Sequence, residues 1–172
     1  MTALFLGAIR ADKGAAELPA VVTELLSVGM AVTIAGRGSL TGPEWSPLLS
    51  DGRVRVVGLS RTLSDDEVAL VLRDCDVLVA PYQDVTMSGS IVMALSAGLP
   101  VAAYSSPALR SFLPDEFLVP PGAVPLAERA LSLAAEAGRW QGSIAEIVLG
   151  LDRKSGTDWS VVLGHLAEGV TC

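Results

Sequence analysis

Residues 81–101 read PYQDVTMSGSIVMALSAGLPV, and this stretch decides the fold. Its pattern predicts the end of one strand, a loop, a helix over 88–97, and the start of another strand at 100. The helix begins with Ser88-Gly89-Ser90. Because the first N–H groups of a helix have no partner within it and lie at the positive end of its dipole, this start suits an anion such as a phosphate.

Short apolar runs alternate with helical patterns along the rest of the chain. Strands are predicted at 3–7, 31–35, 53–57, 76–80, 100–104 and 117–119, and helices at 14–28, 65–73, 88–97, 124–137 and 158–169. The segment 138–158 is the least regular and predicts a loop with a short helix. Several strands are continuously apolar, as in a parallel sheet covered on both faces. We therefore expect a doubly wound, Rossmann-like α/β fold, with residues 1–172 as a single domain.

The composition excludes several classes of function. A formal net charge of −7 over 172 residues argues against nucleic acid as the main partner. The two cysteines, Cys75 and Cys172, form neither a disulfide framework nor a metal site, and Cys75 is expected to be a buried core thiol. No apolar run reaches the ~18 residues of a transmembrane helix, and the N-terminus does not read as a secretory signal. The cytoplasm is the expected compartment.

Polar residues follow the predicted strands, and in this fold class ligands bind outside the carboxyl ends of strands. Arg10 and Lys13 follow the first strand and place two cations at this edge, although a solvated surface pair would look the same. Gly36 follows the second strand, where a backbone without side chain can approach a ligand. Leu59 and Arg61 follow the third strand and either flank a nucleobase or belong to an ordinary loop.

The sequence offers no clear catalytic set. His165 is the single histidine and lies in the last predicted helix, where a packed or solvent-facing role is expected. Ser64 and Glu67 form a capping box that accounts for the acidic run at the start of helix 65–73. No metal-ligand spacing, nucleophilic triad or P-loop can be assembled. We assign no catalytic residue from these patterns.

Several pieces in order resemble a known family. They are FLGAIRADKG, VTIAGRG, VRVVGLSRTLSDDEVALVLRDCDVLVAPY, SGSIVMALSAGLPVAA and FLVPPGAVPLAERALSLA, followed by DWS. Together, over about residues 3–163, they resemble the C-terminal, donor-binding half of retaining glycosyltransferases of family four, also called group 1. Those enzymes have the GT-B fold of two facing Rossmann-like domains. The resemblance implies transfer of a sugar from a nucleotide-sugar with retention and without an essential metal or cofactor.

The resemblance also implies roles for individual residues. Arg10 and Lys13 would hold the donor diphosphate, and the helix start from Thr86 through Ser88, Gly89 and Ser90 would face the phosphates and the sugar. Gly36, Leu59, Arg61 and Met93 would lie at the nucleoside.

This chain departs from the family pattern in two ways. The family carries two glutamates eight positions apart on this helix, and Val85 and Met93 stand in their places, with Asp84 as a neighbouring carboxylate that would substitute. The family's enzymes are also about twice as long, so the acceptor site is expected in another domain or partner chain. The last helix, 158–169, would then pack toward that domain. Self-association is expected through the apolar surface that would otherwise face it. Any membrane contact would be peripheral.

Two alternatives remain from the sequence. One is a non-catalytic interaction module, or the donor-half subunit of a two-chain transferase, which the missing glutamates favour. The other is a different Rossmann-like nucleotide enzyme, such as a sugar-nucleotide epimerase, which would need acid–base residues at the strand ends.

Overall fold

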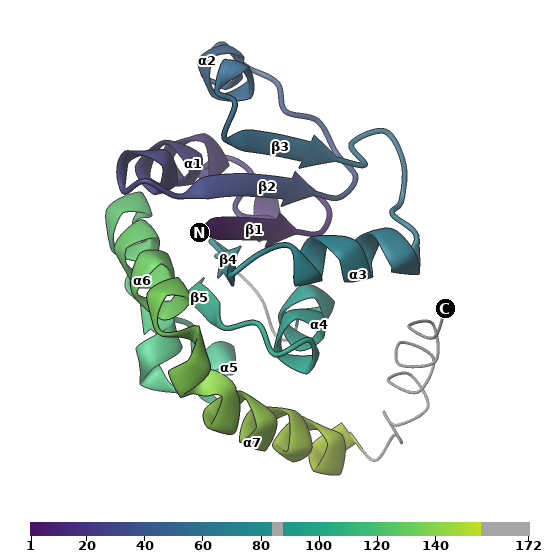
Figure 1. Cartoon of the computed structure of the whole chain (residues 1–172), viewed down its shortest axis with the longest axis vertical. Coiled ribbons are helices and arrows are strands. Elements are labelled where there is room, and N and C mark those ends of the chain that lie inside the picture. The colour runs from purple at the N-terminus through teal and green to yellow at the C-terminus, as the bar shows by residue number, and fades with distance from the viewer. Residues whose placement is uncertain (84–87, 156–172) are drawn as a thin grey trace.

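The protein folds around one parallel β-sheet in a computed structural model that describes residues 1–83 and 88–155 (Figure 1). The strands are β1 (Thr2–Leu6), β2 (Ala31–Ala35), β3 (Val54–Val57), β4 (Val77–Ala80), β5 (Val101–Tyr104) and β6 (Leu118–Val119). Their order in the sheet is β3-β2-β1-β4-β5-β6, and every pair of neighbours is parallel. All six predicted strands are confirmed to within one residue at each end.

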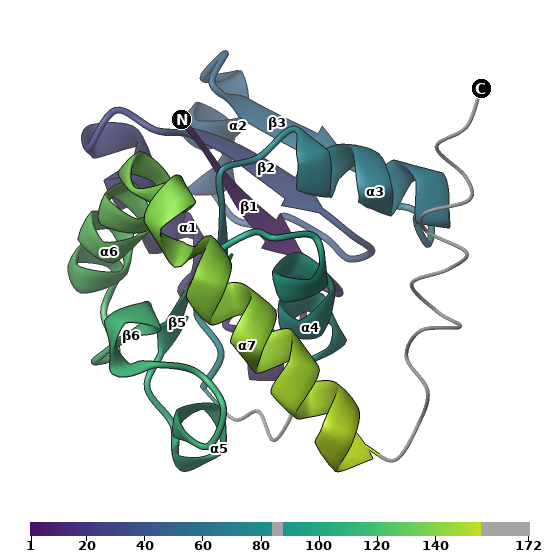
Figure 2. The same ribbon diagram turned by 60° about the horizontal axis from the view of Figure 1, so that its bottom comes forward.

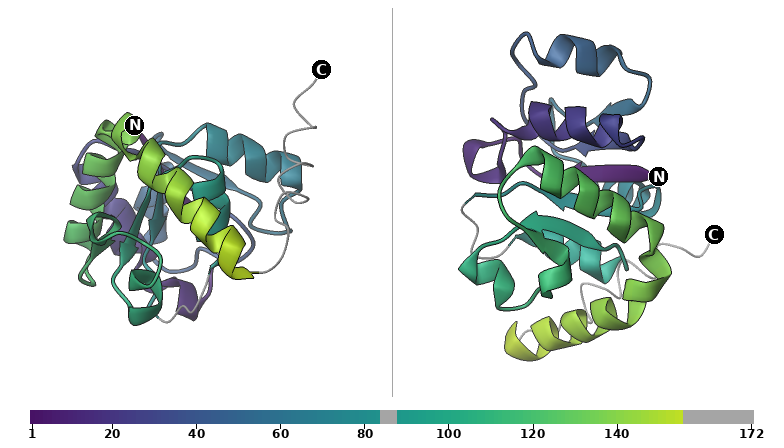
Figure 3. Two further views of the ribbon diagram at one scale, coloured as in Figure 1. Left: turned by 90° about the horizontal axis from the view of Figure 1, so that it is seen from below. Right: turned by 90° about the vertical axis from the view of Figure 1, so that its left-hand side faces the viewer.

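Helices cover both faces of this sheet. The α-helices are α1 (Leu18–Ser27), α2 (Trp45–Ser50), α3 (Asp65–Arg73), α4 (Gly89–Ser96), α5 (Pro107–Arg110), α6 (Ala123–Ala135) and α7 (Ala137–Ser155). Two short 3₁₀ helices, η1 (Ala11–Lys13) and η2 (Asp115–Phe117), lie in loops. Seen from below, the sheet lies between α1 and α6 on one side and α3 and α4 on the other (Figure 3). The predicted doubly wound α/β fold is confirmed.

Burial explains why the central strands are continuously apolar. Strands β4 and β5 are buried along their whole length, and β1 is buried from its second residue on. The edge strand β3 is only half-buried, which suits its alternating sequence VRVV. Cys75 is buried as expected, and burial raises the pKa of its thiol.

Two predictions about helices are wrong. The helix expected at 14–28 begins only at Leu18, because residues 11–13 form η1 and Gly14 ends that short helix in a left-handed conformation, at φ +74°. The segment 138–158, expected to be irregular, is the 19-residue helix α7 as far as Ser155. Figure 2 shows α7 crossing over α4. Its Trp140 packs edge-on against Phe117, with ring centroids 5.5 Å apart, and this contact anchors the first turn.

Candidate functional site

The strand order reverses between β1 and β4. The chain runs from β1 through β2 to β3 in one direction, returns to the other side of β1 as β4, and then continues outward to β6. At such a reversal the loops after the two central strands diverge and leave a crevice, which is where ligands bind in open α/β sheets. Here the two loops are residues 7–13 after β1 and the segment after β4, of which Pro81–Gln83 and Ser88 are described.

Lys13 and Ser88 meet at this reversal. The ammonium Nζ of Lys13 donates a hydrogen bond of 2.7 Å to Ser88 Oγ, across 75 positions of sequence. Lys13 is half-buried, and burial is the main cause that lowers the pKa of its ammonium group; the Asp12 carboxylate raises it and the Arg10 guanidinium lowers it further. Two residues that the resemblance assigns to the donor phosphates are therefore in direct contact, whereas no sequence pattern indicated that they touch.

The Lys13 ammonium also lies over an aromatic ring. Its nitrogen is 4.1 Å from the centroid of the Tyr82 ring, a cation–π distance. Neither the ring nor the Ser88 hydroxyl carries a charge, and no ion pair to Lys13 occurs within the described part of the chain. Both groups in direct contact with the ammonium are thus uncharged, and Asp12, the carboxylate that raises its pKa, is already paired with Arg10. Such an ammonium can attract an anion.

Helix α4 begins without the side-chain cap that its sequence suggests. Ser88 occupies the N-cap position in extended conformation, but its hydroxyl accepts from Lys13 and does not cap the helix. Ser64 and Ser106, the N-caps of α3 and α5, do accept from their own helices. Within the described residues, the N–H groups of Gly89 and Ser90 have no recorded acceptor, whereas the next two donate to the Ser88 carbonyl. Among the described residues, the first turn of α4 therefore has two N–H donors without an acceptor, next to the Ser88 that Lys13 contacts.

Gly14 sets the position of Lys13. It adopts φ +74°, and a Cβ atom there would lie 2.1 Å from the Pro81 carbonyl oxygen. Only glycine allows the backbone after Lys13 to approach the segment after β4 this closely. The close approach brings Lys13 to Tyr82 and Ser88.

Arg10 has a more exposed position. Its guanidinium forms an ion pair of 2.8 Å with Asp12, and its side chain is 61% exposed. It is near enough to Lys13 to lower the pKa of that ammonium, but no hydrogen bond joins it to Ser88 in the described residues. An incoming anion would need to displace Asp12 to bind Arg10 fully.

The residues predicted at the nucleoside are spread over three elements. Gly36 packs against the loop after β1: a Cβ there would lie 2.0 Å from the Gly7 carbonyl oxygen, so loop packing alone accounts for glycine at this position. Leu59 is half-buried, and its carbonyl accepts from the N–H of Gly38. Met93 is 40% exposed on α4, one turn beyond the exposed Gly89.

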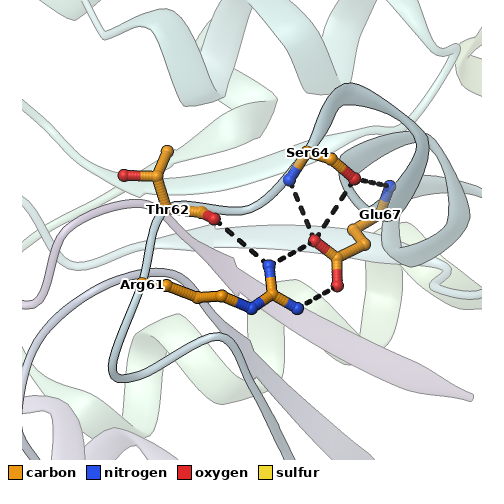
Figure 4. Close-up of polar contacts among 4 residues, drawn as sticks. All are labelled: Arg61, Thr62, Ser64 and Glu67. Carbon is orange, nitrogen blue, oxygen red and sulfur yellow. Dashed lines mark hydrogen bonds and ion pairs between the residues drawn. The ribbon is translucent and has the colours of Figure 1, made fainter.

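The Arg61 guanidinium is already paired with the Glu67 carboxylate (Figure 4). Its Nη1 donates to Glu67 Oε2 at 2.6 Å, and its Nη2 donates to the other carboxylate oxygen. The same carboxylate accepts from the backbone N–H of Ser64, so the predicted capping box is confirmed and Arg61 is joined to it. These contacts hold the pKa of Glu67 at about 2, with the Arg61 hydrogen bond as the main cause.

The structure adds polar residues that the sequence did not indicate. Tyr82 is one, and a second group centres on Glu17, whose carboxylate accepts from the Tyr104 hydroxyl at 2.7 Å and from the Gln83 amide. Burial, together with this carboxylate, raises the pKa of Tyr104. Glu17 thus joins the ends of β4 and β5 to the loop after β1. These partners lie 66 to 87 positions apart, so no local sequence pattern signals them.

Several predicted residues lie outside the described residues. They are Asp84, Thr86, His165, Cys172 and the helix expected at 158–169. In the parts that are described, no group of three or more histidine, cysteine, aspartate or glutamate side chains is placed to hold a metal ion. Of the helices described, none combines the length and the apolar character that a membrane crossing requires.

The two clearest hollows lie away from the strand-order reversal. They measure about 360 and 440 Å³ and share Arg110, which donates to Ser105 at 2.7 Å at the end of β5. Both are shallow and border neither Lys13 nor Ser88. We therefore locate the candidate site from the contacts at the reversal and not from cavity size.

The family described as glycosyl transferases group 1 matches residues 1–136, which is most of the chain. The chain belongs to this family. The matched region ends just after α6 and contains every residue of the candidate site. A comparison with curated proteins found no match.

Solved structures of group 1 and other GT-B glycosyltransferases share the fold. A TarM mutant from S. aureus, in complex with Fondaparinux, alpha-GlcNAc-glycerol and UDP, matches 99% of this chain at 15% identity and a TM-score of 0.75. Sucrose-phosphate synthase from Thermosynechococcus elongatus matches 98% at 19% identity and a TM-score of 0.71. The C-terminal domain of the group 1 protein LpcC from Francisella tularensis matches 89% at 17% identity and a TM-score of 0.65.

The extent of each match differs. This chain spans 35% of the TarM chain and 45% of the sucrose-phosphate synthase chain, but 84% of the LpcC C-terminal domain. The chain thus spans most of the LpcC C-terminal domain but less than half of the other two chains.

Proposed function

We propose that this chain is the donor-binding domain of a retaining glycosyltransferase and binds the diphosphate of a nucleotide-sugar between Lys13 and the first turn of α4. Family membership and the GT-B type of fold support the reaction class. The UDP in the TarM complex supports a nucleotide as the ligand class.

One observation carries this proposal, namely the 2.7 Å contact between Lys13 Nζ and Ser88 Oγ at the strand-order reversal. It brings an unneutralised cation to a helix N-terminus that has free N–H groups among the described residues. Cations and oriented N–H groups stabilise the negative charge that develops on a leaving nucleoside diphosphate. The expected reaction breaks the bond between the sugar and this diphosphate without an essential metal.

The acceptor would be bound elsewhere. Since the chain spans less than half of the TarM and sucrose-phosphate synthase chains, we propose that an additional domain or a partner chain supplies the acceptor site. Self-association through the surface that would face this second half, and a cytoplasmic or membrane-peripheral location, remain predictions.

Calorimetry tests the proposal directly. The wild type is titrated with UDP, GDP and ADP, and Lys13→Ala is expected to weaken binding about 10- to 100-fold, as for loss of a hydrogen bond to a charged group. Arg10→Ala should weaken it only a few-fold, because Arg10 is exposed and already paired with Asp12. Arg73→Ala, at an exposed position on α3, is the matched control and should leave binding unchanged.

Two outcomes would refute the proposal. Either the wild type binds none of the three nucleotides, or Lys13→Ala binds as the wild type does. The first outcome is also what the alternative of a non-catalytic interaction module requires.

A further inference from the structure

Tyr82 occupies the centre of the candidate site without a role in the proposed function. It is buried, with only 1% of its surface exposed, and it lies two residues after β4. The Lys13 ammonium sits over its ring at 4.1 Å from the centroid. Its hydroxyl donates to the Leu6 carbonyl at 3.3 Å, at the end of β1. Tyr82, in the segment after β4, therefore contacts the end of β1 and the loop that follows it.

The Tyr82 ring is fixed by its surroundings. Phe5 of β1 meets it edge-on, with centroids 6.4 Å apart and an interplanar angle of 88°. Burial raises the pKa of the Tyr82 hydroxyl, while hydrogen bonds with Ser90 and Ser88 act to lower it. The edge-on contact with Phe5 and the hydrogen bond from the hydroxyl to the Leu6 carbonyl, both from β1, therefore hold the ring whose face Lys13 covers.

We propose that Tyr82 is a positioning residue that acts through Lys13. Its ring holds the ammonium beside the start of α4, so that a phosphate oxygen entering the site meets a fixed cation. This inference rests on the proposed function, since it assumes that Lys13 binds the diphosphate.

The chemistry of lysine makes such support useful. A lysine side chain is long and flexible, and fixing it costs conformational entropy at the moment of binding unless it is already held. An acidic partner would hold it but would also neutralise it, whereas a ring face attracts the ammonium and leaves its charge available. The ammonium has three donors, of which Ser88 takes one. With a second N–H directed at the ring, one donor remains for an anion while both contacts persist.

Fluorination of the ring provides the test. Tyr82→Phe is the reference, and 4-fluoro-, 3,5-difluoro- and 3,4,5-trifluorophenylalanine are placed at the same position. These rings are nearly equal in size but progressively poorer in π-electron density, so folding should be retained while the attraction for Lys13 weakens. The affinity for UDP and for pyrophosphate, measured by calorimetry, is expected to fall stepwise, by about 3- to 10-fold for the trifluoro ring.

A second series separates positioning from a general structural role. In a Lys13→Met background the same ring series should leave the residual affinity unchanged, because the residue through which Tyr82 acts is gone. Loss of affinity in both backgrounds, no change in either, or tighter binding as the ring is fluorinated would overturn the inference. Tighter binding would mean that the ligand pulls Lys13 away from the ring. If wild-type protein binds neither probe, the proposed function itself fails, which is a different result from binding that ignores fluorination.

Discussion

Lys13 combines a hydroxyl and an aromatic ring as partners and forms no ion pair within the described residues. The ion pairs found among the described side chains all use arginine, as in Arg61–Glu67 and Arg10–Asp12. Lys13 contacts a hydroxyl and an aromatic ring instead. A half-buried ammonium with neutral partners keeps its attraction for anions, because burial reduces screening by water. This contrast makes Lys13 the central residue of the site.

The backbone at Gly14 is predicted to be as important as the Lys13 side chain. In Gly14→Ala the new Cβ would meet the Pro81 carbonyl oxygen at 2.1 Å, at a φ that L-residues rarely adopt. We expect a loss of at least ~2 kcal/mol in the free energy of unfolding, together with weaker nucleotide binding, since Lys13 must move. Urea unfolding and calorimetry measure the two effects.

Gly142→Ala is the matched control for this substitution. Gly142 lies exposed in α7, and a Cβ there would meet nothing within 4 Å. It should stabilise the protein by about 0.5–1 kcal/mol, because alanine is the better helix former. Equal effects of the two substitutions on stability and binding would show that the close approach to Pro81 does not determine the conformation of the loop that carries Lys13.

At the level of single residues, the sequence alone predicted part of the candidate site. Lys13 and Ser88 were predictable together, because both follow strands whose carboxyl ends must meet at one edge of a parallel sheet. Tyr82 was not, since a tyrosine after a buried strand carries no local pattern, and its importance comes from Leu6 and Lys13, 76 and 69 positions away. The pairing of Arg61 with Glu67 was also missed, although the capping box that fixes Glu67 was recognised.

Among the elements, the contrast between α3 and α7 shows what limits such predictions. Helix α3 begins with a local motif, so its bounds were predicted to the residue. Helix α7 contains Gly138, Gly142 and Gly150, which suggest a loop, yet its apolar residues recur at helical spacing. Packing against α4 and α6 outweighs the cost of the glycines, and tertiary packing of this kind is not readable from local propensity.

The start of α3 should respond to acid. The pKa of Glu67 is about 2 in the folded protein and 4.5 as an ordinary carboxyl, so its stabilising contacts are complete above about pH 4.5 and are lost as the pH falls toward 2. Glu67→Gln should therefore reduce stability at pH 7, and its difference from wild type should shrink between pH 4.5 and 2. Urea unfolding across this range measures it.

The control for this effect is Glu128→Gln, at an exposed position on α6. It should follow the wild type at every pH. A difference between Glu67→Gln and wild type that stays constant down to pH 2 would contradict the assigned pKa shift.

The first turn of α7 should depend on the shape of Trp140 more than on its polar group. Its ring packs on Phe117, and its buried indole N–H has no hydrogen-bond partner within the described residues. Trp140→Ala should cost about 3–5 kcal/mol in the free energy of unfolding, as for other large aromatic truncations in a core. Trp140→Phe should cost much less, because it keeps an aromatic ring and removes an unsatisfied donor. Equal losses in the two variants, measured by chemical denaturation, would show that the N–H group matters.

For the whole molecule, one sheet and one core account for the shape without a second domain in the described residues. The family match ends at residue 136, yet the fold similarity to TarM covers 99% of the chain, so α7 belongs to the shared architecture although its sequence lies beyond the family pattern. The candidate site lies at an open sheet edge. Under the proposed function, Lys13 and the start of α4 hold the donor diphosphate, and the acceptor is bound by another domain or chain.

This arrangement predicts that the isolated chain binds a donor but does not transfer its sugar. A ligand that binds only the folded state stabilises it by about 2.7 kcal/mol at 100 times its Kd, so saturating nucleoside diphosphate should raise the Tm by roughly 5–10 °C for a domain of this size. Lys13→Ala, with its 10- to 100-fold weaker binding, should remove about half of that rise or more while melting at nearly the wild-type Tm without ligand. Assays of nucleotide-sugar turnover with this chain alone should show no transfer, since the proposed function places the acceptor hydroxyl on another domain or chain, and a transferase must hold both substrates in position. Transfer by the isolated chain would show that the acceptor site lies within these 172 residues. Transfer that begins only when a second domain or chain is added would support the proposal that donor and acceptor are bound by different domains or chains.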